Sequence, residues 1–486
     1  MQHKSMKKNM LMSIINTSSG FVFPLITYSY VARILHTTGT GKVAFVQSVL
    51  TYFSYIASLG ISGYGMRECA KVRDDRNKLS KLTQELLIIN LVSTIFSYAL
   101  LIAVVVLSSK LQSYKSLFWV MSCSILLQTL GMEWLYGALE EYSYITIRSL
   151  VFKTISVILI FVLVKNENDY ITYGALTIFT TSASNILNFI NVRKYISFKK
   201  YENYDFARHI KPIMTFFMSA IIITVYSQFD TVMLGFMRGD EEVGIYNTAL
   251  KIKTVVIAVS TGLTSVLVPR MTVYYQEDYE KFCRLLSKSF KVSLNILLPL
   301  VLFIFINTKD VIIFLCGAEY LPAIPTLRVL LVCVFALMLT NLFGNQVLIP
   351  KGDEKRYTQS VFVGLWINLF LNGILIPVYG SLGAAIATLI TEGSNTLWMA
   401  YGCKNEVKKI KENTNLRLYI IALLAAIALE FICICAVKSL NVFWRLVFNT
   451  LMMFGVYYVI LLAKKEDIVC EAIRWMGNLK NMKRTL

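Results

Sequence analysis

The stretch EEVGIYNTALKI, residues Glu241–Ile252, resembles an earlier stretch of the chain, GTGKVAFVQSVL, residues Gly39–Leu50. When the copies are aligned at an offset of 203 residues, Gly41 matches Gly244. In both copies a short turn containing glycine lies between two apolar runs, and a basic loop follows the second run. Six apolar runs separate the copies, so both repeats have the same orientation. Parallel repeats of this kind are typical of membrane transporters, whose substrate path lies between the two halves.

Apolar runs of transmembrane length recur along the whole chain. The chain has 486 residues, of which 56% are hydrophobic and 16% are charged, whereas soluble domains carry about 25% charged residues. A helix needs about 20 apolar residues to cross a bilayer. We therefore predict an all-α polytopic membrane protein with about fourteen transmembrane helices. They would form two six-helix lobes around a central cavity, plus two extra helices.

The repeat also predicts how the chain is divided. The expected parts are an N-terminal lobe at 1–196, a cytoplasmic linker at 197–211, a C-terminal lobe at 212–403, extra helices at 417–464 and a basic cytoplasmic tail at 465–486. No loop between the runs is long enough to hold a folded soluble domain. We therefore expect no soluble catalytic domain and no catalytic residues, and we interpret the chain as a transporter rather than an enzyme.

The net charge of +19 has a topological explanation. Most of the 48 Lys and Arg residues lie in loops on one side of the membrane. The most basic of these loops are Gly65–Lys81, Asn191–Lys211, Arg270–Lys291 and Gly402–Arg417. Short loops rich in Lys and Arg stay in the cytoplasm, so both termini are expected there too. The charge therefore predicts orientation, and we expect no nucleic-acid partner.

The cysteines and histidines indicate no metal or disulfide chemistry. The nine cysteines include no CxxC pair, and the three histidines are scattered along the chain. We expect neither a metal site nor a bound cofactor.

Charged residues inside the apolar runs are the main candidates for function. An ionised side chain at mid-bilayer costs at least about 2.5–3.5 kcal/mol, so it usually faces a partner or a water-filled cavity. Lys153, Lys251 and Lys253 lie near the middle of their runs. Asp230 lies near the end of its run and is expected to pair with a lysine of the next helix or with Arg238. The remaining candidates are Arg33, which flanks the first outer turn, together with Glu133, Arg148 and Glu392.

Structural ion pairs and charges that reach the membrane surface are the competing explanation for each of these residues. Cations at mid-depth in both halves favour an anionic guest that bears phosphate or carboxylate. Deep amides, among them Asn16, Gln128, Asn185 and Asn188, either line the same cavity or bond neighbouring helices. Aromatic side chains such as Trp134, Tyr136 and Tyr226 suit sugar rings. Together these residue types favour an amphiphile with a charged, polar head.

The chain resembles the Wzx-type flippases of the multidrug/oligosaccharidyl-lipid/polysaccharide exporter superfamily along nearly its whole length. Six segments in order carry the resemblance: FPLITYSYVARILHTTGTGKVAF (Phe23–Phe45), SLGISGYGMRECAKVRDD (Ser58–Asp75), EWLYGALEEYSYITIRSLVFK (Glu133–Lys153), FDTVMLGFMRGDEEVGIYNTALKI (Phe229–Ile252), LVPRM (Leu267–Met271) and the segment Asn345–Glu392, which begins NQVLIPKGDEKRY. His36 departs from the pattern, because the family often has glycine at that position.

The resemblance implies a function. Such flippases move undecaprenyl-pyrophosphate-linked repeat units of O-antigen, capsule or exopolysaccharide across the bacterial plasma membrane by alternating access. It implies coupling to an ion gradient, with H⁺ and Na⁺ both left open, and polymerase and chain-length proteins as pathway partners. Cavity cations would bind the pyrophosphate; the matching positions here are Arg33, Arg148, Lys153, Lys251, Lys253 and Arg270. The carboxylates Asp230, Glu133 and Glu392 would couple or gate the transport step.

Three alternatives accompany this hypothesis. A multidrug extruder of the same superfamily would favour an acidic cavity, which the predicted cations disfavour. A membrane polysaccharide polymerase would carry a large outer loop with catalytic residues, and the outer loops here are short. A flippase for peptidoglycan precursors would share the fold and the lipid carrier, and would differ only in its sugar contacts.

Overall fold

The computed structural model describes residues 6–264, 267–437, 439–471 and 473–474 and consists of helices joined by turns, with no strand in these ranges. Nine helices among them are long and apolar enough to cross a membrane, and two bent pairs of helices raise the number to eleven. The predicted all-α polytopic membrane protein is therefore confirmed.

Three features account for the difference between eleven spans and the predicted fourteen. The apolar stretches Leu11–Lys71 and Glu354–Gly402 have 61 and 49 residues, whereas about 20 residues cross a bilayer. Each contains a backbone break, at His36 (φ 58°) and at Gly380 (φ 56°), and so forms two spans. Residues 170–191 add one more span, which a π-helical turn interrupts.

The chain forms two compact units. The first comprises Met1–Asn247 and Asn372–Ser381, and the second comprises Thr248–Leu371 and Leu382–Leu486. The lobes predicted from the repeat divide the chain at other positions, and they stay a prediction.

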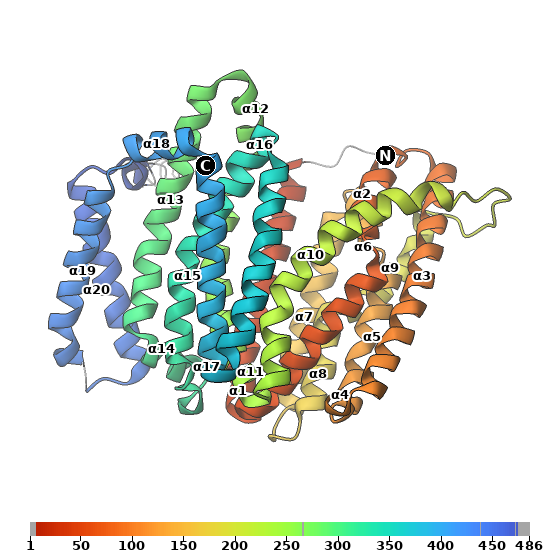
Figure 1. Cartoon of the computed structure of the whole chain (residues 1–486), viewed down its shortest axis with the longest axis horizontal. Coiled ribbons are helices and arrows are strands. Elements are labelled where there is room, and N and C mark those ends of the chain that lie inside the picture. The colour runs from red at the N-terminus through yellow and green to blue at the C-terminus, as the bar shows by residue number, and fades with distance from the viewer. Residues whose placement is uncertain (1–5, 265–266, 438, 472, 475–486) are drawn as a thin grey trace, which may run out of the picture. The chain divides into compact units, whose positions relative to one another are not determined.

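In the first unit, the long helix α1 packs on α3, α5, α7, α8 and α10 (Figure 1). The helices of this unit are α1 (Met6–Ser58), α2 (Ile61–Lys71), α3 (Arg76–Leu107), α4 (Ser109–Gln112), α5 (Lys115–Gly131), α6 (Glu133–Ala138), α7 (Tyr142–Leu163), α8 (Tyr170–Ile178), α9 (Asn185–Asn191), α10 (Ala207–Met237) and the start of α11 (Asp240–Thr264). Asp75 begins α3, because its carboxylate accepts hydrogen bonds from the backbone N–H groups of Asn77 and Lys78. Such a cap satisfies donors that the first helical turn leaves open.

The two matching glycines of the repeat lie where α1 and α11 cross. A Cβ atom on Gly41 would be 1.8 Å from the backbone oxygen of Asp240, and one on Gly244 would be 2.0 Å from that of Thr37. Thr37 and Asp240 are themselves separated by the same offset as the two glycines. The contact is therefore reciprocal, and only glycine permits so close an approach of two backbones. The sequence repeat has a direct structural counterpart here.

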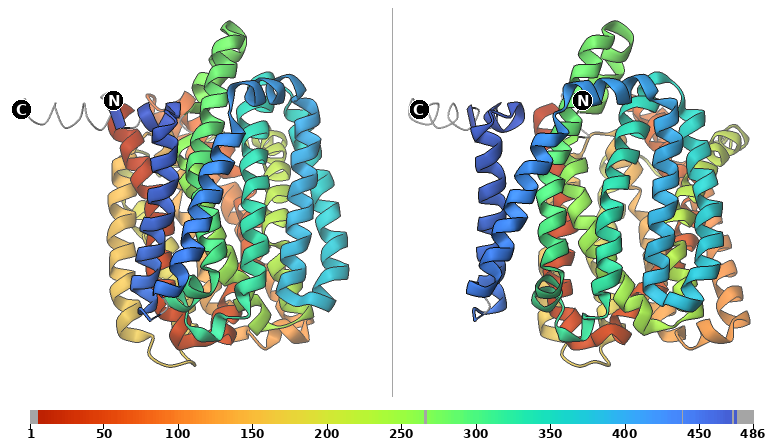
Figure 2. Two further views of the ribbon diagram at one scale, coloured as in Figure 1. Left: turned by 90° about the vertical axis from the view of Figure 1, so that its left-hand side faces the viewer. Right: turned by 60° about the vertical axis from the view of Figure 1, so that its left-hand side comes forward.

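In the second unit, α13 packs on α15, α18, α19 and α20. Its helices are the rest of α11, α12 (Val268–Glu277), α13 (Tyr279–Ile306), α14 (Thr308–Leu315), α15 (Ala323–Phe343), α16 (Ile349–Lys351), the greater part of α17 (Glu354–Gly402), α18 (Lys404–Asn413), α19 (Leu416–Val437) and α20 (Val442–Ala463). Figure 2 shows α19 and α20 as an antiparallel pair beside α13. These two helices are the pair that the sequence places outside the repeat.

The fourth span is interrupted in both repeats. In the first, α5 ends at Gly131, Met132 adopts a left-handed conformation (φ 42°), and α6 begins at Glu133. In the second, the π-helical turn Gly344–Leu348 separates α15 from α16. Interrupted spans at corresponding positions of two repeats mark the substrate region of many transporters. The first break places Glu133 and Trp134 at the cavity described next.

Candidate substrate cavity and membrane-embedded charges

A polar cavity of about 910 Å³ lies inside the first unit. Hydroxyl and amide side chains dominate its wall, and Trp134, Tyr55, Tyr142 and Phe216 add aromatic surface. Among the described lining residues, Glu133 is the charged one. The wall thus offers hydrogen bonds and ring surfaces within a unit whose outer helices are apolar.

One face of α1 supplies much of this wall. Gln47, Thr51, Ser54 and Ser58 all line the cavity, and they are spaced four, three and four residues apart. Residues at this spacing lie on the same face of a helix. This polar stripe was not predicted from the sequence, although its helical spacing was a signal that could have revealed it.

Two lining amides present acceptors without donors. Asn16 Oδ1 and Gln47 Oε1 are buried and have no hydrogen-bond partner among the described residues. A buried polar atom without a partner costs about 1–3 kcal/mol. Because both side chains line the cavity, rotation of either amide would offer its oxygen to the hydroxyl groups of a guest.

The structure brings together two of the predicted charges, Arg148 and Glu133. Arg148 Nη2 lies 2.7 Å from Glu133 Oε1, and its Nη1 donates to the backbone oxygen of Ser184 and to Asn185 Oδ1. The Arg148 side chain is 3% exposed, whereas that of Glu133 is 56% exposed. Arg148 thus fixes the position of Glu133 at the wall and compensates its charge.

Lys153 lies on the same helix as Arg148 and forms a hydrogen bond with a residue of α1. Its Nζ donates to Ser19 Oγ at 2.7 Å. Thr146 Oγ1 donates to the backbone oxygen of Met12 at 2.9 Å, and Tyr30 Oη donates to that of Val164 at 3.0 Å. The first half of α1 is therefore joined to α7 by hydrogen bonds along its length, and Lys153 is the cation among them.

Some of the deep amides line the cavity and others bond neighbouring helices, and Asn185 does both. Asn16, Gln128 and Asn185 line the cavity. Asn188 instead donates to the backbone oxygen of Gly131 at 2.7 Å, and Tyr136 Oη donates to the backbone oxygen of Asn188 at 2.6 Å. These last two residues join helices rather than line the site.

Asp230 lies in a buried cluster of polar groups. Its Oδ2 accepts a hydrogen bond from Tyr246 Oη at 2.7 Å, and its Oδ1 accepts one from Asn372 Nδ2 at 2.6 Å. The side chains come from α10, α11 and α17, and Asp230 is 7% exposed. The predicted pairing of Asp230 with a cation stays a prediction; Arg238 donates to the backbone oxygen of Pro377 at 3.3 Å.

The other predicted charges are spread along both units. Arg33 is exposed on α1 of the first unit. In the second unit Lys251 and Lys253 are half-buried on α11, Arg270 is exposed on α12, and Glu392 is buried on α17. A common cationic site that contains these residues stays a prediction.

The family described as "Polysaccharide biosynthesis protein" matches residues 6–274, and the MatE family matches residues 216–374. A protein of Shigella dysenteriae named "Putative O-antigen transporter" is 25% identical to this chain over 405 residues, which cover 82% of this chain and 100% of the relative.

Two solved structures show the same fold. The structure titled "Lipid II flippase MurJ, inward closed conformation" has a TM-score of 0.74 and 17% identity, covering 94% of this chain and 99% of the other. An inward-facing multidrug resistance MATE family transporter has a TM-score of 0.58 and 12% identity, covering 80% of this chain and 95% of the other. At these identities the likeness concerns the fold alone.

Proposed function

The chain belongs to the polysaccharide biosynthesis protein family, and we propose from this premise that it is a flippase for lipid-linked oligosaccharides. Its substrate is an undecaprenyl-pyrophosphate-linked repeat unit of O-antigen, capsule or exopolysaccharide. It carries the sugar head from the cytoplasmic to the outer leaflet by alternating access and catalyses no covalent reaction. The names of its relatives, an O-antigen transporter and flippases, support this reading over a multidrug extruder.

The polar cavity of the first unit is the observation that carries the proposal. A hydroxyl group moved from water into a hydrocarbon medium that offers no hydrogen-bond partner costs about 4–8 kcal/mol. An oligosaccharide has many hydroxyl groups, so it cannot cross hydrocarbon unaided. A wall of amides and hydroxyls replaces the lost water, and the acceptors of Asn16 and Gln47 take part in this replacement. The Trp134 ring offers a stacking surface for a sugar.

Release of the sugar head requires the chain to alternate between two states. The reciprocal glycine contact of Gly41 and Gly244 joins α1 and α11, the helices that carry the two copies of the repeated stretch. We assign this contact to the closed outer side. Its separation opens the path to the outer leaflet, while the polyprenyl tail stays in lipid throughout.

Coupling to an ion gradient is assigned to Asp230. The ionised carboxylate accepts hydrogen bonds from Tyr246 and Asn372. Protonation removes charge and an acceptor site from the cluster and weakens the connection between α10 and α17. Protons are the proposed ion, and uptake that depends on Na⁺ at constant pH would contradict this assignment. The Asp230→Asn variant is expected to bind substrate yet lose the dependence of transport on the proton gradient.

The proposed location is the bacterial plasma membrane, with both termini in the cytoplasm. The basic loops between spans support this orientation, since Lys and Arg in short loops are retained on the cytoplasmic side. Polymerase and chain-length proteins would act on the product in the outer leaflet.

The proposed function is tested by measuring which leaflet of the membrane holds the lipid-linked repeat units. In cells that lack this chain, complete repeat units should accumulate in the cytoplasmic leaflet, and the wild-type chain should restore their export. Variants with Asn16→Leu and Gln47→Leu should restore it poorly, because leucine cannot hydrogen bond a sugar. Asn203→Ala, an exposed amide in the linker, is the matched control and should restore export fully.

A second pair of variants tests the cations. Lys251→Ala with Lys253→Ala should also fail to restore export if these residues meet the pyrophosphate. Unpolymerised units in the outer leaflet of the deletion strain would instead indicate a polymerase. An unchanged lipid pool with altered drug sensitivity would indicate an extruder.

A further inference from the structure

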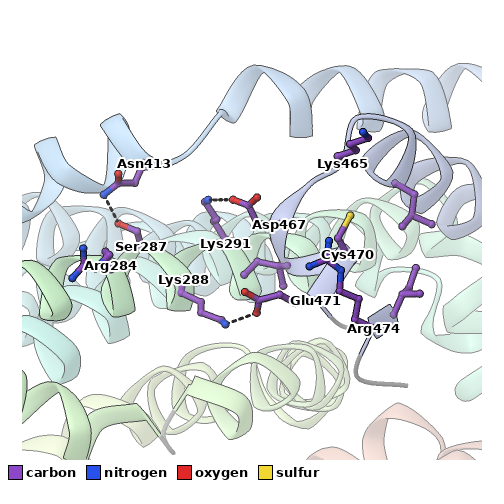
Figure 3. A pocket seen from close by; sticks show the side chains of 13 residues that line it. Arg284, Ser287, Lys288, Lys291, Asn413, Lys465, Asp467, Cys470, Glu471 and Arg474 are labelled. Atoms are coloured by element: carbon purple, nitrogen blue, oxygen red, sulfur yellow. Dashed lines mark hydrogen bonds and ion pairs between the residues drawn. The ribbon is translucent and has the colours of Figure 1, made fainter. Parts of the chain in front are cut away.

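A second cavity, of about 900 Å³, lies in the second unit between the start of α13 and the segment that follows α20 (Figure 3). Lys or Arg occupies five of its lining positions and carboxylates occupy two. The proposed translocation path does not use this cavity, and it is far more basic than the sugar-compatible cavity of the first unit.

A sharp turn directly after helix α20 forms one wall of the cavity. Helix α20 ends at Ala463, and Lys465 adopts a left-handed conformation with φ 55°. Glu466 is 6% exposed; it accepts a hydrogen bond from Tyr419 Oη at 2.7 Å and one from the backbone N–H of Val469 at 2.9 Å. A non-glycine residue in this conformation costs free energy and persists only where its surroundings hold it. The segment 467–471 is thereby turned back toward α13 as a short helix.

Ion pairs hold this segment on α13 but leave the cavity basic. Lys288 pairs with Glu471, and Lys291 Nζ lies 3.1 Å from Asp467 Oδ2. The two carboxylate side chains are 57% and 74% exposed, so these pairs are weak and open to exchange. Figure 3 shows both pairs, with Arg474 beside them. An anionic group that displaces the carboxylates would gain both lysines as partners.

The wall also has an apolar part and hydrogen-bond donors. Leu462, Ile468 and Ile473 line the cavity together with the charged residues. Asn413 Nδ2 lies 3.4 Å from Ser287 Oγ at the opposite wall. A soluble anion makes no favourable contact with apolar side chains. A lipid carries a phosphate group next to hydrocarbon and can contact both parts of the wall. Basic pockets at the ends of transmembrane helices are common binding sites for anionic lipid heads.

We propose that this cavity binds the phosphate headgroup of an anionic glycerophospholipid, and that the bound lipid joins α13 to the segment after α20. Lysines that already have ion-pair partners bind an added phosphate only weakly. The cavity is therefore occupied only when the lipid is abundant in the membrane. Bulk anionic phospholipid meets that condition better than a scarce carrier lipid. The site goes beyond the proposed transport function; only its location in the cytoplasmic leaflet rests on the proposed orientation.

Photocrosslinking tests the proposal. The full-length chain is placed in nanodiscs of phosphatidylcholine that contain a trace of phosphatidylglycerol with a photoreactive headgroup, and crosslinked peptides are identified by mass spectrometry. Crosslinks should appear in the peptides that contain 284–291 and 465–474. Unlabelled phosphatidylglycerol should compete for them, whereas added phosphatidylcholine or inorganic phosphate should not.

Two sets of variants, one that removes positive charges and one that removes negative charges, make the test more specific. Each lysine near an anionic lipid contributes about 1 kcal/mol, so Lys288→Gln and Lys291→Gln should each lower affinity about fivefold. Asp467→Asn with Glu471→Gln removes the competing carboxylates and should raise affinity. Lys408→Gln with Lys411→Gln, exposed lysines on α18, is the matched control and should change little.

Four outcomes would overturn the proposal. Competition by undecaprenyl diphosphate but not by phosphatidylglycerol would assign the cavity to the carrier lipid. Competition by inorganic phosphate would assign it to a soluble anion. If the lysine variants and the carboxylate variants lost crosslinking equally, the ion pairs would serve only to stabilise the fold. No effect of the lysine variants would place the lipid elsewhere.

Discussion

His36 is strained in the backbone of α1. Its dihedral angles, φ 58° and ψ −175°, fall in a region that is nearly restricted to glycine, where other residues lose about 1–3 kcal/mol. We predict that His36→Gly raises the free energy of unfolding by about 1 kcal/mol, because the relief of strain exceeds the added flexibility of the unfolded chain. Thermal unfolding of the purified chain in detergent measures this.

His36→Ala is the control for this variant. Alanine removes the imidazole but keeps the Cβ atom, so the backbone strain should remain and the gain in stability seen with glycine should be absent. An equal gain for alanine and glycine would mean that the imidazole, and not the backbone, is responsible.

Single residues also show where sequence reasoning reached its limit. Arg148, Glu133 and Lys153 were recognised because a charge in an apolar run is conspicuous. Their partners were not predictable, since the direction of a side chain depends on the packing of helices distant in sequence. Asn185 and Asn188 illustrate this: they lie three residues apart, yet one lines the cavity and the other bonds Gly131.

The crossing of α1 and α11 depends on two glycines. A methyl group at Gly41 or Gly244 would collide with backbone oxygen at 1.8 or 2.0 Å, and backbone cannot move aside as a side chain can. We predict that Gly41→Ala and Gly244→Ala each destabilise the closed crossing by about 1–3 kcal/mol, the usual cost of overpacking. The unfolding temperature should fall, and the turns at this end of the two helices should become more accessible to proteases.

Gly20→Ala is the matched control on the same helix. No atom lies within 4 Å of its added Cβ, so alanine should stabilise α1 by about 0.5–1 kcal/mol. If all three variants behaved alike, the glycine contact would have no special role.

The linker between the predicted lobes is docked on α3 by two neighbouring residues. Gln84 Nε2 donates to the backbone oxygen of Ser197 at 2.6 Å, and Gln84 Oε1 accepts from Tyr204 Oη at 2.6 Å. Glu85 is fully buried and accepts from Arg208 at 2.5 Å and from His209 Nε2 at 2.9 Å. These contacts fix the start of α10, which the sequence had presented only as a basic loop followed by an apolar run.

We predict that Glu85→Ala lowers stability by about 1–3 kcal/mol, because the buried His209 ring and the backbone N–H of Asp205 lose their acceptor. Thermal unfolding and proteolysis of the linker should both report the loss. Glu280→Ala is the control, since its side chain is 86% exposed in a long ion pair of 3.9 Å. A small effect at Glu85 would show that Gln84 and apolar packing hold the linker alone.

At the scale of the molecule, hydropathy correctly predicted a polytopic all-α membrane protein, because the bilayer imposes one length on every spanning helix. The polar cavity of the first unit was not predictable in the same way. Lipid and protein core are both apolar, so hydropathy does not tell which face of a helix is buried. The stripe from Gln47 to Ser58 shows that polar spacing, rather than hydropathy, carries that information.

The proposed orientation of the chain rests on its charge pattern and has a direct test. Arg193, Lys194, Lys199 and Lys200 lie in the basic loop Asn191–Lys211, and such loops are retained in the cytoplasm. The turn around Asn168 then lies outside. In a variant without native cysteines, Asn168→Cys should react with a membrane-impermeant maleimide on intact cells. Asn203→Cys, equally exposed in the linker, should react only after permeabilisation.

Activity of the cysteine-free variant in restoring export is the control for this experiment. The reverse labelling pattern would invert the chain and place its basic loops outside. The sugar head would then have to be loaded from the outer side, which is incompatible with a flippase whose substrate is assembled in the cytoplasm. The same pattern would also move the basic cavity beside α13 out of the cytoplasmic leaflet, so this one measurement bears on both proposals through the orientation that they share.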